Sequence, residues 1–149
     1  MPITVQIASR REEDTVLDLI GEFHALGHIP HDRPTVALSV RALLEATGAG
    51  RIWLILFEGK AIGYAALCFG YSIELQGRDA FLDEMYLVEK HRNKGYGKAA
   101  LSLVKTQAKN LGVKALHLEV DRGNETAQRL YASLGFEARD RYFLMTQVL

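Results

Sequence analysis

The sequence has little of what disulfide-bonded, membrane-spanning or strongly charged proteins are built from. Its 149 residues include one cysteine, Cys68, so no disulfide can form within the chain, and we expect a buried thiol in a reducing compartment. The 18 basic and 18 acidic side chains cancel, so no overall field draws nucleic acid or a membrane, and any charge-driven binding must be local. No apolar run approaches the roughly 20 residues of a membrane-spanning helix.

The first residues, MPITVQIASRREED, lack the apolar core of a signal peptide. Apolar residues make up 48% of the chain and charged residues 24%, which is ordinary for a globular protein. We therefore expect a cytoplasmic protein with a single domain over residues 1–149.

The first third of the chain predicts one strand followed by two helices. Ile3 to Ile7 alternates apolar and polar residues, as a half-buried strand does. After a candidate N-cap at Ser9, apolar residues recur at helical spacing as far as Gly27. A second helix is expected from Thr35 to Thr47, after the loop HIPHDRP.

The rest of the chain predicts a sheet with further helices. RIWLILFEGKAIGYAALCFGY indicates two strands joined at Glu58-Gly59-Lys60, and AFLDEMYLV indicates a third. A helix from Lys98 to Leu111, the strand ALHLEV and a short helix from Asn124 to Leu134 follow, and FEARDRYFLMTQVL would add one or two closing strands. The expected fold is α/β (α+β), with a mixed, largely antiparallel sheet of six or seven strands flanked by about four helices, in the order β-α-α-β-β-β-α-β-α-β-β.

Two glycines stand among cations where the third of these strands gives way to a helix, in HRNKGYGKAA at residues 91–100. A chain that passes from a strand through a glycine turn into a helix directs several backbone N–H groups at one point, where the helix dipole also favours an anion. The turn therefore predicts a site for a phosphate or diphosphate. A plain strand-to-helix connection with solvated lysines fits the same local pattern.

Two other phosphate-binding turns are weakened by what is missing. A P-loop requires serine or threonine after the lysine that follows Gly97, but alanine stands there. A dinucleotide turn would have Ala100 in place of its third glycine, with Glu119 or Asp121 as its acidic residue. That turn would open a βαβ unit, whereas this one follows three apparently antiparallel strands, so an ATP- or NAD-dependent enzyme is disfavoured but stays open.

Two segments together carry a family resemblance. Arg92-Asn93-Lys94-Gly95-Tyr96-Gly97 matches the R/Q-x-x-G-x-G/A signature of the GNAT acyltransferase superfamily, and LDEMYLVEKHRNKGYGKAAL resembles its fourth strand, turn and following helix. DRGNETAQRLYASLGFEARDRY resembles its second hallmark, N-x-x-A-x-x-L-Y-x-x-x-G-F. The glycine motif alone is weak evidence, but both motifs on the expected elements, within a matching element order, are strong. The resemblance implies the GNAT fold and transfer of an acetyl group from acetyl-CoA to a primary amine of a small molecule or protein, by direct attack in a ternary complex and without a metal.

The resemblance also implies where coenzyme A binds. The strand segment Met85–Val88 would contact the thioester and pantetheine arm through its backbone, with the Leu87 or Val88 N–H donating to the carbonyl oxygen, and the amides of Asn93 to Lys98 would hold the diphosphate. The full set of expected cofactor-binding residues is Met85, Tyr86, Leu87, Val88, Arg92, Asn93, Lys94, Gly95, Tyr96, Gly97, Lys98, Asn124, Ala127 and Tyr131.

Three residues are candidates for the acid and base chemistry. Tyr131 matches the motif tyrosine that would protonate the CoA thiolate, although its helical spacing also fits a core aromatic residue. Asn124 lies on the same helix face and could contact cofactor or serve as an N-cap. Glu84 and Asp83 are adjacent acids in an apolar strand. The resemblance slightly favours Glu84 as the base, because members of this family often carry a β-bulge here, which resets strict alternation. Either acid could instead bind the ammonium or pair with an arginine.

The resemblance implies an acceptor pocket lined by Phe23, His24, His28, His31, Tyr142 and Phe143. The spacing H-x-x-x-H-x-x-H lacks the cysteines or framing helix of a zinc site, so we expect no metal. A non-catalytic module that senses acyl-CoA is the alternative function, and a homodimer formed through FLMTQVL is possible in this family.

Overall fold

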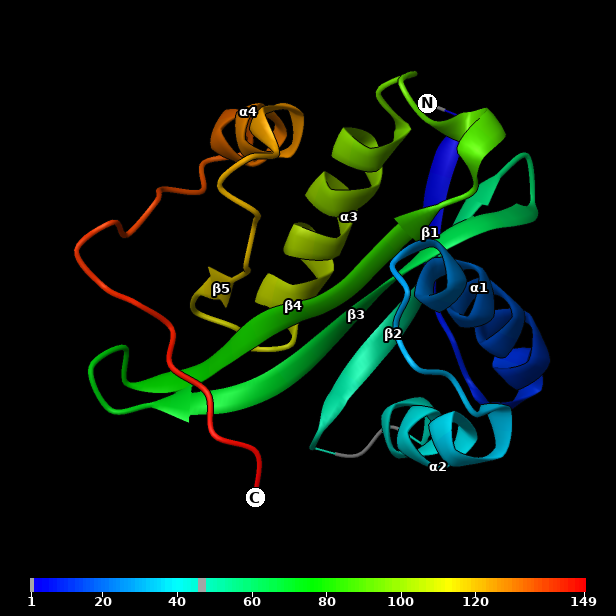
Figure 1. The fold of residues 1–149 in the computed structure, drawn as a ribbon, viewed down its shortest axis with the longest axis horizontal. Helices are drawn as coiled ribbons and strands as arrows, with labels where there is room; N and C mark the ends of the chain where they lie inside the picture. The colour runs from blue at the N-terminus through cyan, green and yellow to red at the C-terminus, as the bar shows by residue number, and fades with distance from the viewer. Residues whose placement is uncertain (1, 46–47) are drawn as a thin grey trace. The chain divides into compact units, whose positions relative to one another are not determined.

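The computed structural model describes residues 2–45 and 48–149, which form two compact units that meet in sequence between Glu119 and Val120. Figure 1 traces the chain. The first unit contains β1 (Ile3–Ile7), η1 (Arg10–Glu12), α1 (Glu13–Leu26), α2 (Arg33–Leu44), β2 (Gly50–Phe57), β3 (Lys60–Ser72), β4 (Gly77–Leu87), η2 (Glu89–His91), α3 (Tyr96–Asn110) and β5 (Leu116–His117). The second contains α4 (Glu125–Ser133). No helix in the described ranges is both long and apolar enough to cross a bilayer.

The sheet has five strands in the order β1-β2-β3-β4-β5. Neighbouring strands are antiparallel except β4 and β5, which run parallel. The predicted mixed, largely antiparallel sheet flanked by helices is confirmed, and the predicted hairpin lies between the end of β2 at Phe57 and the start of β3 at Lys60.

The predicted number of strands was too high. No strand forms within residues 134–149, all of which the structure describes, so the closing strands expected from FEARDRYFLMTQVL are wrong. Phe143 is 81% exposed and Met145 is 89% exposed. The segment has the apolar, β-branched composition of a strand but lacks a ladder partner, and composition alone does not make a strand.

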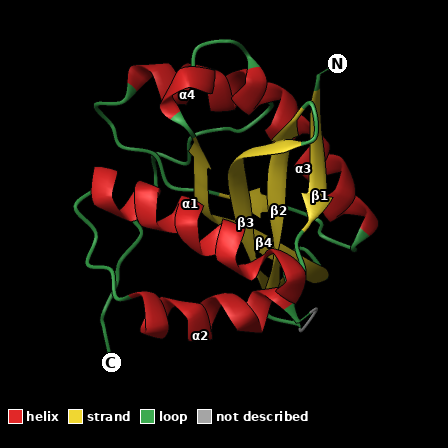
Figure 2. Cartoon of the chain, turned by 90° about the vertical axis from the view of Figure 1, so that its right-hand side faces the viewer, coloured by secondary structure: helices red, strands yellow, loops and turns green. Residues whose placement is uncertain are grey.

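The two faces of the sheet carry different helices, as Figures 1 and 2 show. Alternation along β2 sends Ile52 and Leu54 into a core cluster with α1 and α2. Ile55 joins the opposite cluster, which includes Ala100 of α3, and the Trp53 Nε1–H donates to Gln107 of α3 at 2.6 Å. Fully burying one such aliphatic side chain contributes about 1.5–3 kcal/mol, so each face is held mainly by its apolar contacts.

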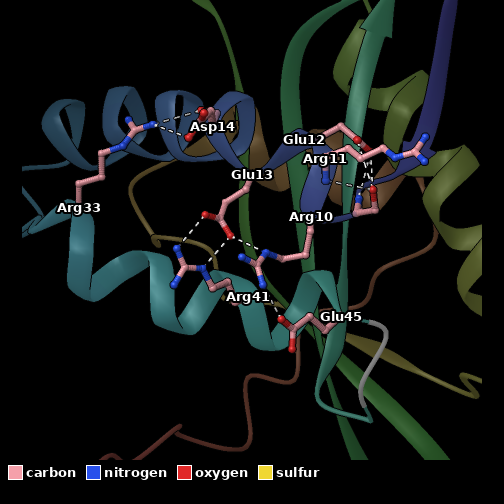
Figure 3. A network of polar contacts seen from close by, with 9 residues as sticks. Arg10, Arg11, Glu12, Glu13, Asp14, Arg33, Arg41 and Glu45 are labelled. Carbon is pink, nitrogen blue, oxygen red and sulfur yellow. Dashed lines mark hydrogen bonds and ion pairs between the residues drawn. The ribbon is translucent and has the colours of Figure 1, made fainter.

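Ion pairs join α1 to α2 (Figure 3). The Glu13 carboxylate accepts from Nε and Nη2 of Arg41 at 2.9 and 3.1 Å, and Nε of Arg10 lies 3.0 Å from it. Arg10 also contacts Glu45 at 2.7 Å. The Arg41 guanidinium lowers the pKa of Glu13, as expected for a two-pronged contact to an ionised carboxylate. These contacts help set α1 beside α2, and both helices border the cavity described next.

Candidate functional site

A β-bulge in β4 brings two neighbouring carboxylates to one cavity. Ala66 of β3 pairs with Glu84, but the next residue, Leu67, pairs with Leu82, so Asp83 is an extra residue in β4. An extra residue breaks the alternation of faces along a strand. Asp83 and Glu84 consequently both line the cavity, whereas strict alternation would have put them on opposite faces.

The cavity lies among α1, α2 and strands β2 to β4 of the first unit and has a volume of about 190 Å³. That volume is far above the roughly 10–15 Å³ needed for one water, so an organic group can enter. Its polar lining residues are His24, Ser39, Asp83 and Glu84, and its apolar lining residues are Ile20, Val36, Val40, Leu43, Ile52 and Ala66.

Glu84 is held by side chains from two other elements. The Tyr64 hydroxyl of β3 donates to Oε1 of Glu84 at 2.9 Å, and Nε2 of His24 lies 2.8 Å from Oε2. Burial, followed by the charge of Glu84, raises the pKa of Tyr64 far above its ordinary value, so this hydroxyl stays protonated. Both oxygens of Glu84 therefore have a partner, and the carboxylate is fixed in orientation.

A chain of histidines leads away from Glu84. Nδ1 of His24 lies 2.9 Å from Nδ1 of His31. His24 is only 7% exposed, whereas His31 is exposed. An ionised carboxylate can only accept, so Nε2 of His24 carries a hydrogen; a neutral His24 then accepts at Nδ1 from His31. The network thus connects the cavity carboxylate to solvent.

Asp83 is the more exposed of the two acids. Partial desolvation among the cavity walls raises its pKa, the charges of Glu84 and Glu119 raise it further, and His24 opposes them. A cation bound in the cavity would relieve this repulsion. Desolvation likewise raises the pKa of the half-buried Cys68 thiol, with smaller contributions from both acids, so the thiol stays protonated.

The other edge of β4 has N–H groups that lack a strand partner. β5 pairs with β4 at Ala80 and Phe81, and no register with β5 extends further along β4 in the described residues. The Val88 N–H donates to the Ile62 carbonyl at 2.9 Å, so the sheet already uses it. Antiparallel pairs alternate in their hydrogen bonding, so the Leu87 N–H, one residue earlier, points away from β3. Of the two predicted thioester donors, Leu87 is the one directed to the open edge.

The glycine turn lies between η2 and α3. Asn93 and Gly95 adopt positive φ angles of 60° and 79°, and α3 begins directly afterwards at Tyr96. Within the described chain, the amides of residues 93–98 donate to no backbone carbonyl, as expected for a helix N-terminus that could bind an anion. The Arg92 side chain instead folds back, since its Nε donates to the Leu87 carbonyl at 2.8 Å and its guanidinium lies over the Tyr86 ring.

The predicted residues of the second unit have clear local contacts. The Asn124 side chain accepts from the Ala127 N–H at 3.1 Å and caps α4, so the N-cap role is confirmed. The Tyr131 ring makes an edge contact with Phe136, and burial raises the pKa of the phenol, which stays protonated. Arg139 stacks on the Tyr142 ring. The cofactor and acceptor roles of these residues stay predictions.

The predicted acceptor residues of the first unit fall into different places. Phe23 packs against Tyr64 and Tyr86, and His31 joins the histidine chain, but His28 is exposed and does not line the cavity. No group of three or more His, Cys, Asp or Glu side chains in the described ranges is arranged to hold a metal.

Sequence reasoning missed Ser39 and Tyr64. Ser39 had a usable signal, because it is a polar residue at helical spacing with Val36, Val40 and Leu43 of α2. Tyr64 had none, because a tyrosine inside an apolar strand run resembles any core aromatic residue.

A family model described as the acetyltransferase (GNAT) family matches residues 16–136 of the chain. Among curated proteins, the chain is similar to an uncharacterized N-acetyltransferase, YycN, of Bacillus subtilis, with 38% identity over 63 residues, or 42% of this chain and 40% of that protein. It is also similar to the aminoglycoside N(6′)-acetyltransferase type 1 of Serratia marcescens, with 33% identity over 96 residues, or 62% of this chain and 65% of that protein. The chain spans about half the length of the curated relatives it matches.

Solved structures agree on the fold. An integron cassette protein from the mobile metagenome of Cole Harbour Salt Marsh matches with a TM-score of 0.85 and 30% identity, over 97% of this chain and 90% of that one. An aminoglycoside acetyltransferase from a soil metagenome, solved with sisomicin, matches with a TM-score of 0.80 and 14% identity, over 99% and 97% of the two chains. At that identity, the second match supports the fold alone.

Proposed function

The chain belongs to the acetyltransferase (GNAT) family, and we propose that it is an N-acetyltransferase that transfers an acetyl group from acetyl-CoA to a primary amine of a small molecule or protein. The main observation behind this proposal is that β4 presents two different surfaces, one on its face and one along its edge. One face presents Asp83 and Glu84 in a cavity, and the open edge presents the Leu87 N–H. One strand would thus hold the amine and the thioester at the same time, as direct attack without a covalent enzyme intermediate requires.

In the proposed reaction the two substrates are bound together. The diphosphate of acetyl-CoA lies on the amides of residues 93–98, and the Leu87 N–H donates to the thioester carbonyl oxygen, where negative charge develops. The other residues that the two motifs lead us to expect in contact with cofactor are Met85, Tyr86, Val88, Arg92, Asn124, Ala127 and Tyr131.

Glu84 is the proposed base. It takes a proton from the ammonium of the acceptor, directly or through a water, while Asp83 attracts the cation. The neutral amine then attacks the carbonyl carbon, the C–N bond forms and the C–S bond breaks, and Tyr131 gives its proton to the departing thiolate. The second proton leaves the nitrogen through solvent and restores the Tyr131 phenol, which gives the neutral amide. The contacts of Tyr64 and His24 with Glu84 support this role, because they hold its carboxylate in a single orientation.

Two wider attributes are part of the proposal. The single, protonated Cys68 suits the reducing conditions of the cytoplasm. The exposed apolar side chains of the C-terminal segment, among them Phe143, Met145 and Val148, support a homodimer formed through that segment.

The proposal is tested by thiol release from acetyl-CoA with a panel of primary amines, together with thermal unfolding in the presence of CoA, ATP or NAD. CoA at 100 times its dissociation constant should add about 2.7 kcal/mol to the unfolding free energy, and at least one amine should release thiol. Stabilisation by CoA with no amine accepted would favour the acyl-CoA-sensing module. Stabilisation by ATP or NAD but not CoA would contradict the proposed cofactor.

The role of Tyr131 has its own test. Tyr131→Phe removes the proposed acid, and a general acid contributes about 10²–10⁴-fold to rate. We expect the rate of thiol release to fall by about a hundredfold or more while CoA still stabilises the protein. Tyr71→Phe is the matched control, since Tyr71 is 78% exposed and is not among the predicted site residues. Unchanged thiol release in Tyr131→Phe would exclude this tyrosine as the acid.

A further inference from the structure

The cavity beside Glu84 has a largely hydrocarbon wall. One stripe of α2 supplies Val36, Val40 and Leu43, and Ser39 lies within that stripe. Leu38 points elsewhere on the same helix and is 66% exposed. The opposite wall consists of core side chains, since Ile52 of β2 is 1% exposed and Ala66 of β3 is 4% exposed. A ligand that enters beyond the acids therefore meets mainly methyl and methylene groups.

The polar groups of the cavity are few and mostly engaged. Both oxygens of Glu84 and both ring nitrogens of His24 take part in the hydrogen bonds already described. Ser39 and Asp83 are the other polar side chains of the lining. A ligand rich in hydroxyl groups would leave several of them unpartnered against hydrocarbon, at about 1–3 kcal/mol each. The wall thus disfavours a sugar.

The negative charge of the cavity is confined to one place. Asp83 and Glu84 are adjacent in sequence, and repulsion from Glu84 contributes to the raised pKa of Asp83. One ammonium group bound there relieves that repulsion. A second cation further along the ligand would lie among Val36, Val40 and Leu43, where desolvating a charge is costly.

We propose that the acceptor is a monoamine on an apolar stem, an alkylamine or aralkylamine whose ammonium lies at Asp83 and Glu84 and whose stem lies against Val36, Val40 and Leu43. This inference rests on the proposed N-acetyltransferase function and narrows its substrate class. It separates this chain from its aminoglycoside-acetylating relative, because sugars bearing several amino and hydroxyl groups do not fit such a wall.

The test compares amines that differ in one property at a time. Thiol release is measured with ethylamine, butylamine, hexylamine and phenethylamine, then with 1,5-diaminopentane, spermidine and kanamycin. We expect kcat/KM to rise about fourfold for each added methylene until the stem is buried, which corresponds to ~0.8 kcal/mol. Because 1,5-diaminopentane has the length of hexylamine with a charge in place of the terminal methyl, it should be at least tenfold poorer.

Two substitutions in α2 test whether its apolar residues cause the dependence of kcat/KM on chain length. Leu43→Gln places an amide in the cavity wall and should flatten the dependence on chain length, so that hexylamine loses about tenfold in kcat/KM while ethylamine is unchanged. Leu38→Gln, on the exposed side of the same helix, should keep the wild-type series. Val36→Thr, which preserves volume, replaces Leu43→Gln if that variant fails to unfold cooperatively. Calorimetric titration with hexylamine measures binding without turnover.

The outcomes separate this inference from the function on which it rests. Kanamycin, spermidine or 1,5-diaminopentane accepted as well as hexylamine would overturn the substrate class and leave an N-acetyltransferase. Hexylamine bound in a Leu43-dependent way, with no thiol released from any amine, would overturn the function but not the apolar amine site. A flat chain-length series with no hexylamine binding would overturn the inference outright.

Discussion

The cavity beside β4 is lined by side chains, whereas the glycine turn that follows β4 presents backbone N–H groups. On the cavity side, the proposed chemistry depends on the side chains of Asp83 and Glu84 and on His24 from a distant part of the chain. In the turn, the proposed binding depends on backbone N–H groups that the positive φ of Gly95 and the start of α3 leave without carbonyl partners in the described residues. Backbone geometry tolerates many side chains and needs a few glycines, so it leaves a short motif. A cavity lined by side chains from several elements leaves no such motif, so a sequence indicates a cofactor more directly than an acceptor.

The largest expected effect isolates the cavity. Glu84→Gln keeps the size and most contacts of the side chain but cannot take a proton, so kcat should fall by about 10²–10⁴-fold. CoA affinity should stay the same, because the turn is untouched. Steady-state thiol release and calorimetric titration with CoA make the two measurements, and Glu22→Gln, an exposed acid on α1, is the control. A loss of CoA binding in Glu84→Gln would mean that the two regions are not independent.

The converse variant isolates the turn. Gly95 has φ of 79°, and a Cβ there would meet nothing within 4 Å, so Gly95→Ala suffers backbone strain without a clash. The strain is about 1–2 kcal/mol, and the added methyl group would take up part of the open space around residue 95 that a bound diphosphate needs. We expect CoA affinity to fall at least tenfold with hexylamine binding unchanged. Gly59→Ala, with the same φ of 79° in the β2–β3 turn and the same open surroundings, controls for strain. Equal CoA affinity in the two variants would place the diphosphate elsewhere.

A smaller effect concerns what holds Glu84 in place. His24→Leu removes the donor to Glu84 and the link to His31, and we expect about a tenfold lower kcat/KM. His24→Gln keeps a donor near the position of Nε2 and should recover most of the lost kcat/KM. A purely structural role for His24 would lower stability and kcat/KM in both variants, with no recovery in His24→Gln.

How well each feature could be predicted from the sequence depends on how far apart its contacting residues lie along the chain. Local signals worked: the alternation of Ile3–Ile7 and the glycine-containing turn after Phe57 both mark elements of the structure. The cavity required contacts that span the chain, since His24 meets Glu84 across 60 positions of sequence. It also required the bulge at Asp83, which the family resemblance suggested but which no periodicity of the residues themselves specifies. The C-terminal strands failed for a related reason, because strand formation depends on a partner and not only on the apolar residues of FLMTQVL.

The smallest expected effect tests whether Asp83 contributes to the stability of the fold or to the binding of an amine. Folding raises the pKa of its carboxyl, so the native state binds this proton more tightly than the unfolded chain. Ionisation therefore lowers stability, and the loss develops as pH rises from the ordinary value of about 3.9 through the higher folded value. Asp83→Asn should thus stabilise the ligand-free protein at pH 7, by less than about 1 kcal/mol because the exposed charge is screened. Thermal unfolding at pH 7 and near pH 3.5 measures this, with Glu22→Gln as the control, and the difference should vanish at the lower pH.

Hexylamine should bind the variant more weakly. Destabilisation at pH 7 would instead assign Asp83 to the fold, whereas a gain in stability with a loss of amine affinity is what an acid retained for its ligand would give.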